Sequence, residues 1–279
     1  MSRVKPSNPV INRSHPLARR LVGAWPMGLA WMRDQSDLTG KWKAHANTLQ
    51  IAAGQEISPY GWANTGNGSN TGIDTDFYAE GLDSMSVSVH VRFDDVSTWQ
   101  SVIGSWWAYN YLMSMGVASD GKTSIFIRNG ATNPGSYSGA TTLVAGQWYH
   151  LVYCLRKNGS NLDADIYVDG VLDKTGTHGS VENFASNSTY PYRIGALRYY
   201  GGHTNAVDGA IADCKVFDKF LTASEVADLY SDPWALYRPA RPVRKRYYYV
   251  SAPIAAAAGG GAWSIAGRTF SFPNKKRRF

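Results

Sequence analysis

The sequence predicts an all-β protein, built as a two-sheet sandwich of the jelly-roll kind with one short helix. One stretch of the chain has the pattern of a three-stranded antiparallel meander. Many other short strand-like runs are separated by Gly, Asn, Asp and Ser, at the close spacing typical of sandwiches. The chain has 279 residues, 44% of them hydrophobic, which is enough for one large β domain with a real core.

The first predicted strands follow an arm. Residues 1–20 contain three prolines and no helix or strand period, so we expect them to be extended. A strand over Leu21–Trp25 opens the body, and Met85–Phe93 alternates between apolar and polar side chains. That alternation is typical of a strand buried on one face only. The side chains expected on its other face are Ser86, Ser88, His90 and Arg92.

The later strands end in the meander. Further strands are predicted over Gln100–Trp106, Tyr111–Val117, Thr123–Arg128 and Ala140–Leu143. The meander runs through Trp148–Arg156, Ala164–Val168 and Val171–Thr175, and the first two are rich in aromatic and β-branched residues. Asn158-Gly159 and Asp169-Gly170 supply the positive φ that tight hairpin turns require.

A capping box predicts the helix. Thr222 is placed as the N-cap with Glu225 at N3, and Leu221 and Val226 are spaced as a hydrophobic staple. Asp232-Pro233 ends the helix, because a residue before proline is disfavoured in the α region.

Several passages occur in an order that resembles a known family. They are Leu21–Trp25, Trp148–Val152, Tyr167–Gly170, Tyr192–Gly195, Asp208–Asp213 and Val216–Leu221. Together they resemble the laminin-G-like domains of the concanavalin A-like lectin and glucanase family, over residues 17–232. The resemblance implies a concanavalin A-like domain over 21–232, between an N-terminal arm of 1–20 and a C-terminal arm of 233–279.

Charge separates the arms from the body. Residues 1–20 carry +5 and residues 233–279 carry +10, with no acidic residue in either. Because the whole chain carries +7, residues 21–232 carry −8. The C-terminal arm keeps large aromatic residues, which solvated linkers lack, so we expect it to fold onto another subunit. The expected anchor residues are Trp234, Tyr237, Arg238, Arg241, Arg244, Lys245, Arg246, Trp263, Arg277 and Arg278.

Basic arms allow three interpretations: nucleic-acid binding, localisation signals, or anchoring to an acidic assembly. No recognisable nucleic-acid-binding fold is present, which favours the anchor. The passage over 232–239 also resembles the end of laminin-G-like domains in structural proteins of tailed bacteriophages. It implies a virion protein that contacts capsid, neck or tail proteins. We expect a homo-oligomer there, with a trimer as the first arrangement to consider.

No membrane or secretory segment is expected. No apolar run approaches the length of a membrane helix, and the N-terminus has no apolar signal-peptide region. The resemblance therefore implies a protein made in the host cytoplasm and incorporated into the virion.

We expect no catalytic site. Retaining glycosidases need two carboxylates about 5 Å apart. The four glutamates, however, form no convincing acid pair on a strand; they are Glu56, Glu80, Glu182 and Glu225. No nucleophile elbow or zinc motif occurs, and Cys154 and Cys214 are expected as reduced core thiols. No cofactor is expected. The loop acids either form turns or bind calcium, and both roles stay open for Asp34, Asp37, Asp74, Asp76 and Asp208.

The family resemblance implies carbohydrate binding, in which sugars stack on aromatic faces. Two aromatic clusters beside turn residues fit such a site, although the same residue types also anchor cores and subunit contacts. The candidates are Trp106, Trp107, Tyr109, Tyr111, Tyr199, Tyr200 and His203. We expect a non-enzymatic virion protein, a capsid decoration, neck or tail component, whose lectin-like body engages a host-surface glycan. The alternatives are a free-standing carbohydrate-binding protein and, after it, a glycoside hydrolase.

Overall fold

The computed structural model describes residues 11–27, 54–69, 71–75, 77–79, 81–106, 111–129, 132–179, 191–199, 202–237, 264–265 and 268–269. The chain divides into two compact units, Met1–Arg241 and Pro242–Phe279. In the second unit, β17 (Ser264–Ile265) pairs with β18 (Arg268–Thr269). Within the described ranges, no helix has the length and apolar character needed to cross a membrane.

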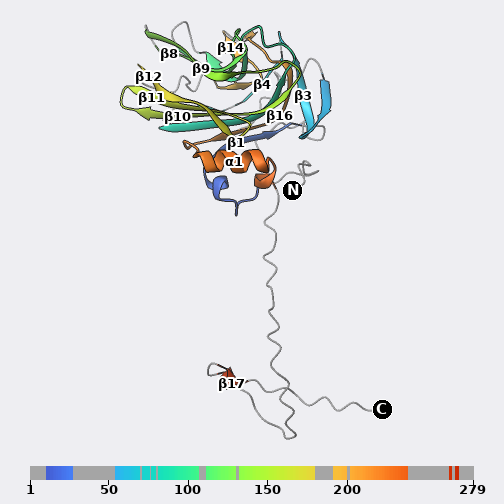
Figure 1. Cartoon of the computed structure of the whole chain (residues 1–279), viewed down its shortest axis with the longest axis vertical. Helices are drawn as coiled ribbons and strands as arrows, with labels where there is room; N and C mark the ends of the chain where they lie inside the picture. Colours follow the sequence, from blue (N-terminus) through green and yellow to red (C-terminus); the bar gives the residue numbers. More distant parts are fainter. Residues whose placement is uncertain are drawn as a thin grey trace. The chain divides into compact units, whose positions relative to one another are not determined.

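The first unit is a sandwich of two antiparallel sheets, as the sequence predicts (Figure 1). The strands of the large sheet are β1 (Leu21–Pro26), β2 (Gly54–Ser58), β3 (Gly61–Asn67), β5 (Ser84–Phe93), β10 (Trp148–Asn158), β11 (Asn161–Val168), β12 (Val171–His178) and β16 (Asp208–Phe217). They pair in the order β12-β11-β10-β5-β16-β3-β2, and β1 also pairs with β16.

The small sheet lies over the large one. Its strands are β4 (Ile73–Asp74), β6 (Gln100–Trp106), β7 (Tyr111–Val117), β8 (Lys122–Asn129), β9 (Thr132–Thr142) and β13 (Arg193–Ile194), in the order β4-β13-β6-β7-β8-β9. Strand β9 starts at Thr132 rather than at the predicted Ala140. It takes in Pro134, which an edge strand tolerates because half of its N–H groups need no partner. A separate hairpin, β14 (Leu197–Tyr199) with β15 (Gly202–Thr204), follows β13.

The predicted meander is confirmed as β10-β11-β12. Its second turn has positive φ at both central residues, 51° at Asp169 and 83° at Gly170, which matches the twist of the flanking strands. A Cβ on Gly170 would lie 2.9 Å from a ring carbon of Tyr230. Glycine is therefore required there both by the backbone conformation and by the close approach of Tyr230, which lies on the helix α1 (Ala223–Ser231).

An apolar core fills the space between the sheets. The predicted apolar face of β5 points into it through Met85, Val87, Val89, Val91 and Phe93. The small sheet contributes Ile103, Met113, Met115, Ile125 and Ile127. Cys154 and Cys214 are both buried and unpaired, as predicted.

The polar face of β5 is also buried, which corrects the prediction of a strand buried on one face only. Ser86, Ser88 and His90 are 0% exposed, and Arg92 is the residue of this set that reaches solvent. The correction has a physical cause, because helical and terminal segments cover the outer face of the large sheet.

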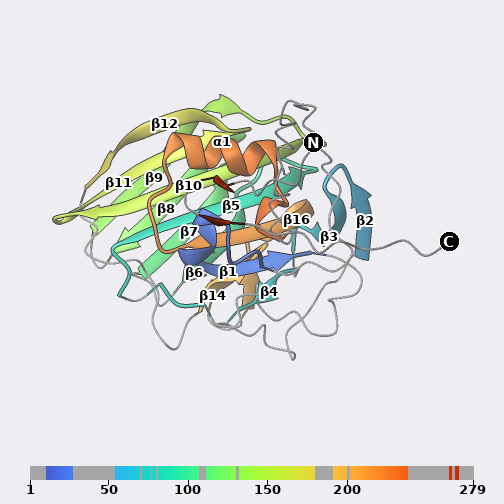
Figure 2. The same ribbon diagram turned by 90° about the horizontal axis from the view of Figure 1, so that it is seen from below.

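This cover is a second apolar core, formed beneath α1 (Ala223–Ser231), η1 (Pro16–Arg19) and η3 (Ala235–Tyr237). Seen from below, α1 lies across the large sheet (Figure 2). The predicted capping box is present: Thr222 Oγ1 accepts from the Glu225 amide, and the Glu225 carboxylate accepts from the Thr222 amide. Leu221 and Val226, the predicted staple, are both buried in this core.

The N-terminal stretch predicted as an arm is partly folded. Pro16 opens η1, the ring of His15 accepts a hydrogen bond from the Leu17 amide, and Leu17 is buried in the second core. Proline suits the first turn of a helix because its missing N–H would have no partner there. Residues 11–20 therefore belong to the domain.

The C-terminal arm also starts later than predicted. Trp234, Leu236 and Tyr237 are buried against the large sheet. The Asn12 amide donates to the Leu236 carbonyl at 2.6 Å, so the two ends of the domain meet. Trp234 and Tyr237, expected as anchors for another subunit, are instead part of this domain's own core.

A buried polar network holds this C-terminal segment. Asp213 on β16 pairs with Lys215 of the same strand and accepts a hydrogen bond from the Tyr237 hydroxyl at 2.8 Å. The Lys215 ammonium lies 5.6 Å from the ring centroid of Trp234 and 5.1 Å from that of Tyr237. Because an unpaired buried charge is strongly destabilising, these contacts specify where residues 234–237 dock.

Two histidines extend the network across the sheet. The rings of His90 and His150 stack with centroids 4.5 Å apart, and Ser88 Oγ lies 2.9 Å from His150 Nε2. Burial, helped by the charge of Lys215, lowers the pKa of His150 to about 3. His150 is therefore neutral in the folded protein over the ordinary pH range.

We predict that truncation after residue 237 preserves the stability of the domain, whereas truncation after residue 232 lowers it by at least about 3 kcal/mol. The shorter chain loses the side chains of Trp234, Leu236 and Tyr237 from the second core and leaves Lys215 and Asp213 partly uncovered. Urea unfolding of both truncated chains and of Trp234→Ala in the full chain measures this. Equal unfolding midpoints for the two truncated chains would show that residues 233–237 do not support the domain.

We also predict that His150 weakens the domain in acid. Its folded pKa of about 3 lies below the ordinary 6.5, so between these pH values only the unfolded state gains the proton. As the pH is lowered from 6.5 towards 3, the free energy of unfolding therefore decreases by up to about 1.4 kcal/mol per pH unit. In His150→Gln, the loss of stability from pH 7.5 to pH 4.5 should be smaller than in the wild type. Parallel stability curves for the two proteins would contradict this.

Candidate functional site

The outward face of the small sheet carries the candidate site. Residues paired across neighbouring antiparallel strands point to the same face, so the register sets them in rows. One row across β6, β7 and β8 is Trp106, Leu112 and Arg128, and the next is Gly104, Ser114 and Phe126. A third row is Ser101, Gly116 and Ser124. We call these nine residues the platform.

Aromatic rings and hydroxyl groups share the platform. Trp106 and Phe126 are half-buried, and Trp99 packs edge-on against Phe126 with ring centroids 4.6 Å apart. Ser114 Oγ donates to Ser101 Oγ at 3.0 Å, whereas the Oγ of Ser124 has no hydrogen-bond partner among the described residues. All three serines are at most 1% exposed, so the platform reaches solvent through Trp106, Phe126 and Arg128.

The hairpin β14-β15 lies on the same face, beside β6. A Cβ on Gly104 would come within 2.7 Å of Leu197 Cδ1, so the absence of a side chain at Gly104 lets β14 approach the sheet. Of the cluster predicted at the β6-β7 hairpin, Trp106 therefore shares a face with the β14-β15 hairpin. Tyr111 alternates with the core residues Met113 and Met115, so it holds a core-facing position of β7 rather than a platform position.

The predicted carbohydrate-binding residues are described to different extents. Trp106 lies on the platform with its side chain described. The backbones of Tyr111, Tyr199 and His203 lie on β7, β14 and β15. Trp107, Tyr109 and Tyr200 lie outside the described residues, as do the side chains of the expected anchors Arg238, Arg241, Arg244, Lys245, Arg246, Trp263, Arg277 and Arg278.

Sequence reasoning missed Phe126 and Arg128 as platform residues. The signal was available, because Ile125 and Ile127 alternate with Ser124, Phe126 and Arg128 within a predicted strand. The isoleucines enter the core, so the other three must point outward. The alternation within the predicted strand Thr123–Arg128 could therefore have identified these residues as outward-facing.

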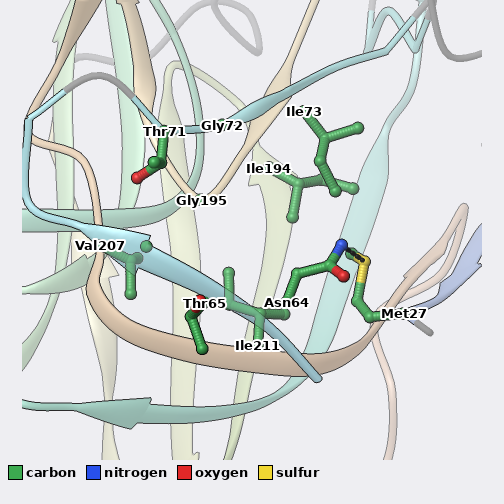
Figure 3. Close-up of a pocket in the computed structure, with 11 residues that line it drawn as sticks. Met27, Asn64, Thr65, Thr71, Gly72, Ile73, Ile194, Gly195, Val207 and Ile211 are labelled. Atoms are coloured by element: carbon green, nitrogen blue, oxygen red, sulfur yellow. Dashed lines mark hydrogen bonds between the residues drawn. The ribbon is translucent and has the colours of Figure 1, made fainter. Parts of the chain in front are cut away.

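A small cleft lies at the side of the sandwich, between β3 and β16 of one sheet and β4 and β13 of the other (Figure 3). Its cavity volume is ≈ 30 Å³, about the volume of one water molecule, and Met27, Ile73, Ile194, Val207 and Ile211 make its lining mostly apolar. Asn64 Nδ2 points to Met27 Sδ at 3.3 Å. The cleft offers few polar groups to a saccharide, so the platform is the better candidate.

Ser88 and His150 form a serine–histidine pair, but it is closed to substrate. Both side chains are 0% exposed beneath the second core, and the lowered pKa of His150 reflects that burial. A general base needs access to its substrate and a pKa near the working pH. The pair is therefore a structural part of the buried network.

The loop acids left open as calcium ligands are not brought together in the described part of the chain. Asp74 forms an ion pair with Arg193, its cross-strand partner, and both side chains are buried. Asp208 is half-buried on β16, and Asp34, Asp37 and Asp76 lie outside the described residues. No group of three or more His, Cys, Asp or Glu side chains among the described residues is arranged to hold a metal ion.

The fold resembles solved structures of carbohydrate-active proteins. Domain 4 of AbnA, a GH43 extracellular arabinanase from Geobacillus stearothermophilus in complex with arabinotriose, has a TM-score of 0.58 at 21% identity, covering 76% of this chain and 98% of that chain. A Trypanosoma rangeli sialidase in complex with 2,3-difluorosialic acid has a TM-score of 0.51 at 16% identity, over 80% of this chain and 35% of the sialidase. At these identities the likeness shows the fold alone. A comparison with curated proteins found no match.

A family model described as the concanavalin A-like lectin/glucanases superfamily matches residues 64–227. The match covers more than half of the chain. It includes β5 to β16 and hence the whole platform. By this match and by its two-sheet fold, the chain belongs to the concanavalin A-like lectin/glucanase superfamily, through a laminin-G-like domain.

Proposed function

We propose that the domain binds carbohydrate at the platform and does not cleave it. The observation that carries the proposal is Trp106, a half-buried tryptophan on an outward sheet face that also holds the phenyl ring of Phe126 and the guanidinium of Arg128. The apolar face of a sugar ring packs on an indole, while its hydroxyls need hydrogen-bonding partners nearby. Membership of a superfamily of lectins and glucanases supports this chemistry.

The positions of the acidic groups favour binding over hydrolysis. Glycosidases use two carboxylates about 5 to 9.5 Å apart on either side of the scissile bond. The nine platform residues include no Asp or Glu. Elsewhere, Glu56 pairs with Arg92, and Glu225 caps α1 and pairs with Lys219. This arrangement supports a binding role for the described face.

The two chain ends leave the domain on the side opposite the platform. Asn12 and Leu236 are hydrogen-bonded to each other among segments that cover the outer face of the large sheet. The platform is the outward face of the other sheet. Attachment through the ends would therefore leave the platform open, which suits a displayed binding domain.

Charge supports attachment to an acidic assembly. Residues 1–10 carry +2 and residues 238–279 carry +10, with no acidic residue in either segment. Because the whole chain carries +7, residues 11–237 carry −5. An acidic partner would attract the arms and repel the domain, which orients the protein on approach. Because Trp234 and Tyr237 are in the domain core, the anchor consists of residues beyond them. We propose a phage particle as this assembly, on the resemblance of residues 232–239.

The second candidate is a free-standing carbohydrate-binding protein, for which the platform alone is sufficient. In the first candidate residues 238–279 anchor the protein to a particle, whereas in the second they have no role in attachment. A glycoside hydrolase ranks after both, because the described platform residues supply no carboxylate pair.

We predict that Trp106→Ala weakens binding to an oligosaccharide identified from a broad panel by at least about tenfold, since it removes the stacking surface. Isothermal titration calorimetry measures the affinity. Trp148→Ala is the matched control, because Trp148 is also half-buried but lies on the large sheet. A loss in the control with none in Trp106→Ala would place the site elsewhere.

We predict that deleting residues 238–279 abolishes incorporation into phage particles while the unfolding midpoint of the domain stays unchanged. The deleted segment holds ten positive charges, and the two cores, as formed by the described residues, extend only to Tyr237. Incorporation is measured by quantifying the protein on purified particles. Normal incorporation of the deletion variant would reject the anchor and favour the free-standing protein.

A further inference from the structure

Arg128 differs from the other strand arginines whose side chains the structure describes. The others are each paired with a carboxylate: Arg92 with Glu56 and Asp94, Arg156 with Asp163, and Arg193 with Asp74. Within the described part of the chain, Arg128 forms no ion pair or hydrogen bond, yet it is half-buried. A guanidinium in that position loses part of its hydration without gaining a protein partner.

The position of Arg128 points to a ligand. It lies on β8 in one row with Leu112 and Trp106, near the end of the small sheet where β6 and β8 end. No platform residue is acidic, so the platform itself supplies no carboxylate to pair with Arg128. A planar guanidinium donates two parallel hydrogen bonds to a carboxylate or a sulfate, beside an aromatic surface that holds the rest of the ligand.

We propose that the platform selects acidic saccharides, with Arg128 binding the carboxylate or sulfate of a sugar whose ring packs on Trp106. The proposal rests on the carbohydrate-binding function proposed above and adds the chemical class of the ligand.

A single cation fits this ligand class better than it fits a nucleic acid. Nucleic-acid grooves place several basic side chains along a backbone. The nine platform residues include one basic residue, and the strands beside Arg128 present Leu112, Ser114 and Ser136 on that face. One guanidinium beside one indole matches one acidic group on one sugar unit.

The test compares matched acidic and neutral oligosaccharides on the full chain. The pairs are sialyllactose with lactose, a short oligogalacturonate with its methyl ester, and a sulfated with an unsulfated chondroitin oligosaccharide. The first two pairs probe a carboxylate and the third a sulfate. Affinities are measured by calorimetry for wild type, Arg128→Gln and Arg156→Gln. Arg156→Gln removes the same charge from a strand of the large sheet, and the basic arms are identical in all three proteins.

The wild type should bind the acidic member of at least one pair about tenfold or more tightly than the neutral member, as expected for a charge-assisted contact. Arg128→Gln should remove that preference and keep the weaker neutral binding, and Arg156→Gln should keep the preference. Equal preference in wild type and Arg128→Gln would overturn the acidic subsite while leaving carbohydrate binding in place. Absence of binding to every saccharide would overturn both proposals.

Discussion

The need to cover both faces of the large sheet constrains the rest of this structure. One face packs on the small sheet through an apolar core. The other carries Ser88, His90, Asp213 and Lys215, all 0% exposed, beneath α1 and the two terminal segments. Buried polar groups are stable only when paired, so the cover must supply partners as well as apolar surface. The Tyr237 hydroxyl on Asp213 and the rings around Lys215 do so.

This constraint gives the domain two different sides. Since η1, α1 and η3 are used to cover the large sheet, both chain ends are fixed there, and Asn12 meets Leu236. The outward face of the small sheet carries the half-buried Trp106, Phe126 and Arg128, and Gly104 allows the β14-β15 hairpin to approach it. The proposed attachment through the chain ends and the proposed recognition at the platform thus use opposite sides of the domain, and the acidic domain with basic arms fits that division.

Much of the fold could be predicted, because local patterns determine it. The Asp169-Gly170 turn, the alternation of β5 and the Thr222–Glu225 capping box are short-range signals, and all three are confirmed. What covers a face is a long-range property. The sequence therefore misled on the polar face of β5, and it gave no strand pattern for β2 and β3, where Gly54–Ser58 and Gly61–Asn67 are rich in glycine and polar residues.

The candidate site could be predicted only in part, for the same reason. The sequence predicts Trp106 as a site residue because it is aromatic and lies beside a turn. Arg128 becomes a candidate only when the strand register places it in one row with Leu112 and Trp106. Hydrogen–deuterium exchange of the full chain with and without bound oligosaccharide tests the central claim most directly. The account predicts ligand-induced protection in 101–106, 111–117 and 122–129, with none in 223–237. Protection confined to α1 or to the cleft beside Met27 and Asn64 would contradict it.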